Sequence, residues 1–161
     1  MTLTVEPWTE DSLELLRRCN TPEMTVYLGG PETEQKVISR HVRYLGYAQD
    51  EPVVAWPLRV VVDGEAVGSV NYWTTEDGFE MGWAIAPEHQ NRGYARAGVL
   101  AGLDHARSHG LTGRFHANPS VDNAASNGVA RSAGFTLLRQ LDIEYPPGHT
   151  MRANNWVLDL R

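Results

Sequence analysis

The stretch that decides the fold runs from Phe79 to Ala97 and reads FEMGWAIAPEHQNRGYARA. It predicts a strand that passes through a Pro-Glu turn into a glycine-containing loop and then directly into a helix. The first backbone N–H groups of a helix have no acceptor within it and lie at the positive end of its dipole. The stretch therefore predicts a site where main-chain donors bind an anion such as a pyrophosphate.

Side chains in this loop favour the same interpretation. Gly93 has no side chain at the point where phosphate oxygens would approach the backbone, and Ala95 has only a methyl group in the next turn. Arg92 and Arg96 can add positive charge nearby. Neither GxxxxGK[ST] nor GxGxxG occurs, since Tyr94 and Ala95 follow Gly93, so two other classes of phosphate-binding loop are excluded. Taken alone, a glycine before a helix also fits an ordinary helix start.

Periodicity and turn residues predict seven strands and four helices along the rest of the chain. The strands are expected at Leu3–Pro7 and at residues 58–62, 66–73, 79–86, 112–117, 136–145 and 155–160. The helices are expected at residues 9–19, 33–45, 93–110 and 122–133, the last of them capped by Asp122. This order, β, α, α, β, β, β, α, β, α, β, β, predicts an α+β protein with a mostly antiparallel sheet.

The composition indicates one globular domain over residues 1–161. No apolar run approaches the roughly 20 residues of a membrane span, and no signal peptide is recognisable, so we expect a cytoplasmic protein that does not contact membranes. The formal net charge is −6, which argues against nucleic acid as a partner and would suit a cationic acceptor. A single cysteine, Cys19, allows no intramolecular disulfide, and no residue spacing predicts a metal site.

The loop also carries a more specific signal. Residues 90–95, QNRGYA, match the Q/R-x-x-G-x-G/A signature of GNAT acetyltransferases. Asn123, Ser126 and the Gly134-Phe135 pair fall where that family has N-x-x-A/S followed by a terminal Gly-Phe. The chain thus resembles GNAT superfamily N-acetyltransferases over essentially its whole length. It is most similar to the RimJ/RimL-type branch, which the PWTED of residues 7–11 and the YLGG of residues 27–30 also match.

The resemblance implies an acetyl-CoA-dependent N-acetyltransferase that needs no metal. Its sheet of about seven strands, flanked by about four helices, would splay apart to admit acetyl-CoA. Backbone groups of Trp83, Ala84 and Ile85 would bond the pantetheine arm as an added strand does. The remaining cofactor contacts implied are the pyrophosphate donors Asn91, Arg92, Gly93, Tyr94, Ala95 and Arg96, and the next helix's Asn123 and Ser126.

Amine acetylation requires a base, because an ammonium has no lone pair with which to attack. Glu80 lies on the strand just before the cofactor segment, where the family often has an acidic base, and we predict that it accepts the proton. His116, near the end of the facing strand, is the alternative, since histidine titrates in the right range. A paired or solvated carboxylate and a structural histidine are the non-catalytic interpretations of the two residues.

The general acid departs from the family pattern. The family's usual acid is a tyrosine seven residues after the asparagine, and Ala130 occupies that position. Either Ser126, acting through water, protonates the leaving group, or the thiolate leaves unaided, since its free pKa is about 8.5. Because Cys19 lies far from the loop in sequence, direct transfer is favoured over a covalent intermediate. We expect Ala130 to face the cofactor cleft, so that Ala130→Tyr would be tolerated.

The acceptor pocket is expected between the first two helices and the last hairpin. Tyr27, Trp73 and Tyr145 are the predicted substrate-binding residues, and Trp83 and His149 could also line the pocket. The partner expected is an amine substrate, either a protein N-terminus or a small amine such as a polyamine or an aminoglycoside. A second copy of the chain, forming a homodimer, is a further option. A regulatory module that binds acyl-CoA without turnover is the alternative function.

Overall fold

Seven strands form one mixed sheet in the computed structural model, which describes residues 1–161. Their order across the sheet is β1-β2-β3-β4-β5-β7-β6. The strands are β1 (Leu3–Pro7), β2 (Ala55–Val62), β3 (Glu65–Thr75), β4 (Gly78–Ile85), β5 (Gly113–Ala117), β6 (Thr136–Glu144) and β7 (Thr150–Leu160). Every neighbouring pair is antiparallel except β4 and β5, so the predicted mostly antiparallel sheet is confirmed.

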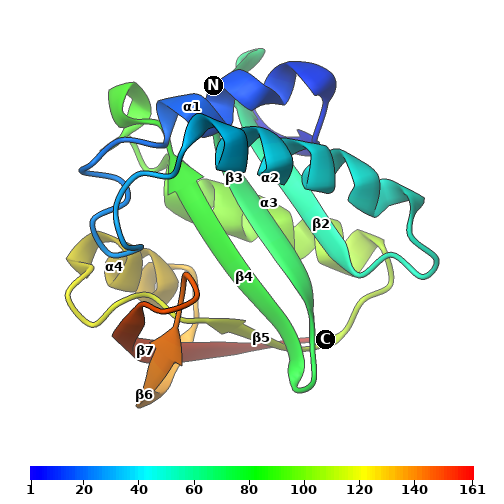
Figure 1. Ribbon diagram of the computed structural model, residues 1–161. Coiled ribbons are helices and arrows are strands. Elements are labelled where there is room, and N and C mark those ends of the chain that lie inside the picture. Colours follow the sequence, from blue (N-terminus) through cyan, green and yellow to red (C-terminus); the bar gives the residue numbers. More distant parts are fainter.

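Four α-helices cover the sheet, in the order along the chain that the sequence predicts. They are α1 (Leu13–Arg18), α2 (Glu34–Gly46), α3 (Tyr94–Ser108) and α4 (Ala124–Ser132). Figure 1 shows α1 and α2 on one face of the sheet and α3 on the other. Helix α4 lies beside α3 and packs against β6 and β7. None of the helices combines the length and the apolar character that a membrane crossing requires.

Small residues bring α3 close to the sheet. A Cβ added at Gly98 would lie 3.0 Å from Val60, and one at Gly102 would lie 2.8 Å from Val70. Between these glycines the fully buried Val99 enters the main hydrophobic core. Because the helix cannot shift outward without opening this core, its N-terminus is held at the end of β4.

Asn123 caps α4, and the prediction of Asp122 as the cap was wrong by one residue. The Asn123 side-chain oxygen accepts a hydrogen bond from the backbone N–H of Ser126 at 3.1 Å. The chain is still turning at Asp122, because the Asn123 N–H donates to the carbonyl of Ser120 at 3.0 Å. Helix α4 is therefore capped one residue later than the prediction from Asp122.

The sheet opens between β4 and β5. Only two residue pairs join these parallel strands, Phe79 with Phe115 and Glu80 with His116. Strand β4 pairs with β3 along its length, and β5 pairs with β7. Each of the two separating strands is therefore held by a neighbour on the side away from the opening. Figure 1 shows β4 and β5 diverging beyond the paired residues. The predicted splay of the sheet is therefore present, and it leaves one edge of β4 without a strand partner from Met81 to Ile85.

Candidate functional site

Six consecutive backbone N–H groups, from Asn91 in the loop before α3 to Arg96 in its first turn, donate to no protein acceptor. The helix bonds begin only with the Ala97 N–H, which donates to the Gly93 carbonyl at 3.1 Å. Asn91 and Gly93 have positive φ values of 63° and 80°, and such alternation of backbone conformation makes a concave anion-binding loop. The loop fits the pyrophosphate that the sequence predicts as its ligand.

Side chains around this loop have different roles. Gln90 donates from Nε2 to the Ile85 carbonyl at 3.0 Å and so ties the loop to the end of β4. Arg96 donates from Nε to the Ser132 carbonyl at 3.2 Å, which holds its guanidinium at the end of α4. Arg92 is exposed and forms no ion pair. Of the two arginines expected to add charge, Arg92 is therefore the one free to turn toward a phosphate.

The open edge of β4 carries the backbone groups predicted to bind the pantetheine arm. Trp83, Ala84 and Ile85 pair with β3 on one side, while their β5 side has no strand partner. Unpaired strand-edge groups can accept an extended ligand as an additional strand. The Trp83 side chain packs against the main core, so only its backbone is offered at this edge.

Helix α4 closes the other side of the opening. The Asn123 side-chain oxygen is already used by its own helix, which leaves its NH₂ group for a ligand. Ser126 is half-buried, and its hydroxyl forms no hydrogen bond within the protein. The Tyr27 hydroxyl donates to the Asp122 carbonyl at 3.0 Å, so the segment between α1 and α2 is anchored to the start of α4. Tyr27, predicted to bind substrate, thus has a structural contact as well.

Ala130 does not face the cleft, and that expectation was wrong. Its exposed fraction is 0%, and it belongs to the main hydrophobic core, together with Phe135 and Trp156. The buried amide of Asn127 explains the orientation, because its Oδ1 accepts hydrogen bonds from Trp156 at 2.8 Å and from Asn154 at 2.9 Å. These bonds turn the face of α4 that carries Ala130 toward β7.

We therefore expect Ala130→Tyr to destabilise the protein. A phenol added to a filled core costs about 1–3 kcal/mol or more through displaced side chains. The melting temperature should fall, whereas Ala125→Tyr on the exposed side of the same helix should change it little. Thermal unfolding of both variants checks this. An unchanged melting temperature for Ala130→Tyr would show that the position opens into the cleft.

The two candidate bases lie side by side where β4 and β5 are still paired. Glu80 is opposite His116, and both line a cavity of about 170 Å³. Both lie at the point where the strands begin to separate, next to the unpaired edge of β4. The cavity is lined by Thr75, Asp77, Glu80, His116, Asn118, Arg139, Leu141 and Asn155.

Hydrogen bonds distinguish the two candidates. Nδ2 of Asn155 lies 3.0 Å from Nδ1 of His116 and donates to Oδ1 of Asn118 at 2.8 Å. Because the amide is the donor, Nδ1 of His116 accepts, and the proton of the neutral ring lies on Nε2. That Nε2 is buried without a partner in the protein. This arrangement favours Glu80 over His116 as the candidate base.

The electrostatics of Glu80 suit proton acceptance. Burial raises the pKa of the Glu80 carboxyl above its usual range, and the Asn118 side chain opposes part of this shift. A carboxylate with a raised pKa is a stronger base than a solvated one. Asn118 and Asn155, which set this environment, were not anticipated from the sequence, because neither belongs to a local motif.

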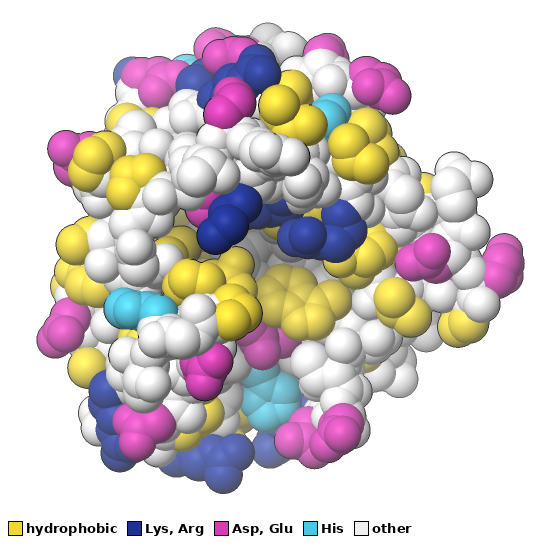
Figure 2. Space-filling view, viewed as in Figure 1, with side chains coloured by type: hydrophobic (Ala, Val, Ile, Leu, Met, Phe, Trp, Pro, Cys, Tyr) yellow, Lys and Arg dark blue, Asp and Glu magenta, His cyan; other side chains and the backbone are white.

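A second cavity, of about 200 Å³, reaches the strand next to that of Glu80. It lies between the end of α2 and strands β2 and β3, and Trp73, the strand partner of Glu80, is part of its wall. Figure 2 shows this face hollowed below α2, with basic side chains at the rim and a hydrophobic floor. The lining residues are Arg43, Tyr44, Tyr47, Ala55, Pro57, Asn71, Tyr72 and Trp73.

The three predicted substrate-binding residues do not share one pocket. Trp73 lines the second cavity, Tyr27 is bonded to Asp122, and Tyr145 is 51% exposed just after β6. Arg43 and Tyr44 were not predicted, because helical periodicity shows which side of α2 is polar but not what that side covers.

Two further observations concern possible metal ligands and the single cysteine. No group of three or more His, Cys, Asp or Glu side chains is placed to hold a metal ion. Burial raises the pKa of the Cys19 thiol to about 11, so it is protonated near neutral pH. A protonated thiol is a poor nucleophile.

Known proteins share this architecture. The structure of the acetyltransferase that modifies the N-terminal serine of ribosomal protein L7/L12 in Salmonella typhimurium matches with a TM-score of 0.80 at 20% identity, covering 100% of this chain and 96% of that one. Spermidine N-acetyltransferase from Vibrio cholerae, solved with CoA and spermine, matches with a TM-score of 0.78 at 17% identity, covering 98% and 95%.

The aminoglycoside acetyltransferase AAC(6')-Ib, solved with coenzyme A, also matches, with a TM-score of 0.78 at 17% identity and coverage of 98% of this chain and 95% of that one. No curated protein matches the chain. The family described as "Acetyltransferase (GNAT) domain" matches residues 2–136. The loop before α3, the splayed sheet and this match agree, and the chain belongs to the GNAT acetyltransferase family.

Proposed function

We propose that the protein transfers an acetyl group from acetyl-CoA directly to a primary amine, either a protein N-terminus or a small amine. The observation that carries this proposal is the continuity of the free donors at Asn91 to Arg96, the unpaired edge of β4, and Glu80. A pyrophosphate on the loop and an extended arm along β4 would direct the thioester toward Glu80. The residues present therefore fit acetyl-CoA.

Glu80 would take the proton that the amine must lose. Its carboxylate lies beside His116, whose buried Nε2–H has no protein partner and can donate to a substrate oxygen or a water molecule. Acetyl-CoA supplies an activated thioester, whose carbonyl carbon accepts the amine nitrogen as the thiolate leaves. The chain's own contribution is to orient both substrates and to accept the proton.

Protonation of the thiolate needs no dedicated acid. Ser126, with its unbonded hydroxyl, is the side chain of α4 that the sequence predicts to deliver a proton through water. We expect Ser126→Ala to lower kcat by about ten-fold or less, because a thiolate with a pKa of about 8.5 leaves without assistance. Steady-state kinetics test this. A loss as deep as that of Glu80→Gln would identify Ser126 as the acid.

Thiol release from acetyl-CoA against a panel of amines tests the proposed function. Release that depends on an amine, together with a mass increase of the amine by one acetyl group, supports it. CoA binding without thiol release for every amine class would favour the alternative, a regulatory module that binds acyl-CoA. The panel should include N-terminal peptides, polyamines, aminoglycosides and amino acids.

A further inference from the structure

Arg43 is the only charged side chain that lines the cavity between α2 and strands β2 and β3. It forms no ion pair, and its guanidinium lies 5.9 Å from the centre of the Tyr44 ring. Its neighbours on this side of the fold are paired: Arg40 with Glu32, and Arg17 with Glu34. In a chain with 20 acidic and 14 basic residues, an arginine left without a carboxylate at a cavity mouth is available to a ligand.

The rest of the cavity wall would hold the apolar part of such a ligand. Tyr47 and Trp73 contribute aromatic surface, and the Asn71 amide, which donates to the Tyr44 hydroxyl at 3.3 Å, adds a polar group. Planar guanidinium groups bind carboxylates through two parallel hydrogen bonds. Arg43 therefore makes this wall suited to a carboxylate.

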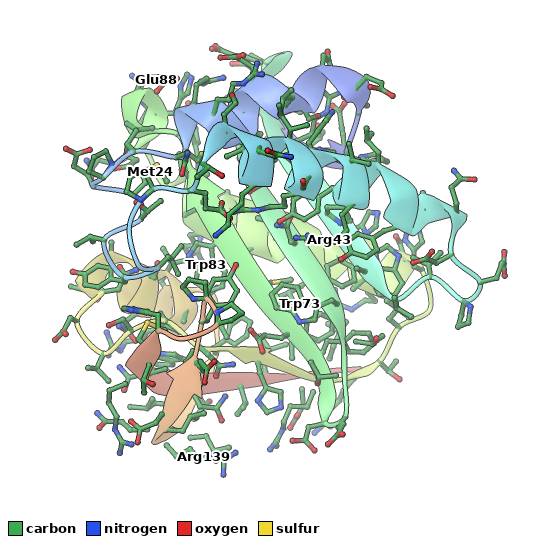
Figure 3. The ribbon with its side chains drawn as sticks, in the orientation of Figure 1. Met24, Arg43, Trp73, Trp83, Glu88 and Arg139 are labelled. Carbon is green, nitrogen blue, oxygen red and sulfur yellow. The ribbon has the colours of Figure 1, made fainter.

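Trp73 connects this cavity to the proposed base. Its strand partner is Glu80, and a Cβ added at Gly82 would lie 3.9 Å from the Trp73 ring, so the indole lies over β4. Figure 3 shows Arg43, from α2, and Trp73, from β3, on the same face of the sheet. A ligand along the indole would have one end at Arg43 and the other near Glu80.

The two cavities also differ in charge. The cavity around Glu80 holds Asp77 and Glu80 against Arg139, whereas the neighbouring cavity holds Arg43 alone. An ammonium is attracted to the first and repelled from the second, and a carboxylate behaves in the opposite way. The net charge of the whole chain suggests a cationic acceptor, but the charges next to the site indicate one that carries both signs.

We propose that the acceptor amine carries a carboxylate, which Arg43 binds while the amine reaches Glu80. This inference rests on the proposed acetyltransferase function and narrows its substrate class. The carboxylate is either that of a free amino acid or an aspartate or glutamate side chain close to a protein N-terminus. Polyamines and aminoglycosides, which are polycations without a carboxylate, are disfavoured as acceptors.

Matched acceptors test the proposal. One pair is β-alanine and its amide, and the other is a peptide beginning serine-aspartate and the same peptide beginning serine-asparagine. We expect kcat/KM to favour the acid over the amide by about ten-fold or more in at least one pair, because only the acid offers Arg43 a charged hydrogen-bond acceptor. The pair that shows the preference identifies the source of the carboxylate.

Arg43→Gln should reduce this preference to near unity, by lowering the kcat/KM of the acid far more than that of the amide. Lys36→Gln is the matched control, since it removes one positive charge from the exposed side of the same helix without touching either cavity, and it should keep the preference. CoA affinity and melting temperature should stay the same in both variants.

Some results would overturn this inference about the carboxylate but not the proposed acetyltransferase function. These are equal use of acid and amide by the unchanged protein, a higher kcat/KM for spermine, or an Arg43→Gln loss shared by acid and amide. If no amine releases thiol, the proposed function fails, and binding decides instead. Calorimetric titration of the CoA-loaded protein with each pair should then show tighter binding of the acid, lost in Arg43→Gln. Equal binding of acid and amide rejects the proposal.

Discussion

Gly93→Asp should abolish CoA binding in a protein that still folds. Gly93 has φ 80° and ψ 8°, a left-handed conformation in which aspartate is better tolerated than most residues. An added Cβ would meet no atom within 4 Å, so the side chain enters open space. Gly93 is also the residue just before α3, so the added carboxylate would lie close to the free N–H groups. The left-handed backbone strains any side chain at this position, so the variant should fold with a moderately lowered melting temperature.

The same features make the aspartate a competitor of the pyrophosphate. Its carboxylate would accept hydrogen bonds from the free N–H groups of α3 and repel a second anion there. Losing two hydrogen bonds of about 1.5–3 kcal/mol each corresponds to roughly a hundred-fold or more in Kd. Calorimetric titration with CoA, next to a melting curve, measures both effects.

Gly93→Asn is the control for this experiment. Asparagine has nearly the same shape and the same tolerance of positive φ but no charge. It should weaken CoA binding less than aspartate does. The difference in Kd between the two variants then measures the electrostatic part of the lost CoA affinity. A folded Gly93→Asp protein with the CoA affinity of the unchanged chain would refute the proposed pyrophosphate site.

Glu80→Gln should lower kcat by about 10² to 10⁴, the usual effect of losing a general base. Glutamine keeps the shape of the side chain but cannot take the proton of the amine. CoA affinity should stay within a few-fold, because the free donors that hold the pyrophosphate lie beyond the end of β4. Steady-state kinetics and CoA titration of the same preparation separate the two quantities.

The pH profile adds an independent measurement. Glu80 acts as a base only when it is ionised, and burial raises its pKa, so kcat/KM should fall as the pH drops through a value above the usual carboxyl range. Glu80→Gln should lose this acid limb. If Glu80→Gln keeps full activity while His116→Ala is inactive, His116 is the base and our assignment is reversed.

The sequence by itself determined the order of the elements and the place of the anion-binding loop. Both depend on local signals: apolar periodicity separates strands from helices, and Gly93 between a strand and a helix marks an exposed helix start. The N–H groups of Tyr94, Ala95 and Arg96 are unbonded for the same local reason, because a helix cannot satisfy its own first donors, and those from Asn91 to Gly93 belong to the loop that leads into it. The predicted cap of α4 was one residue off because such boundaries depend on the exact turn.

Only the tertiary structure decided which side chains meet. Glu80 and His116 are neighbours because two strands far apart in sequence pair in parallel, and Arg43 reaches the wall beside Trp73 because α2 crosses β3. Ala130 is in the core, not in the cleft, because the buried bonds of Asn127 fix the rotation of α4. Strand register and helix rotation are set by packing between distant segments, and a single sequence contains no local pattern that specifies them.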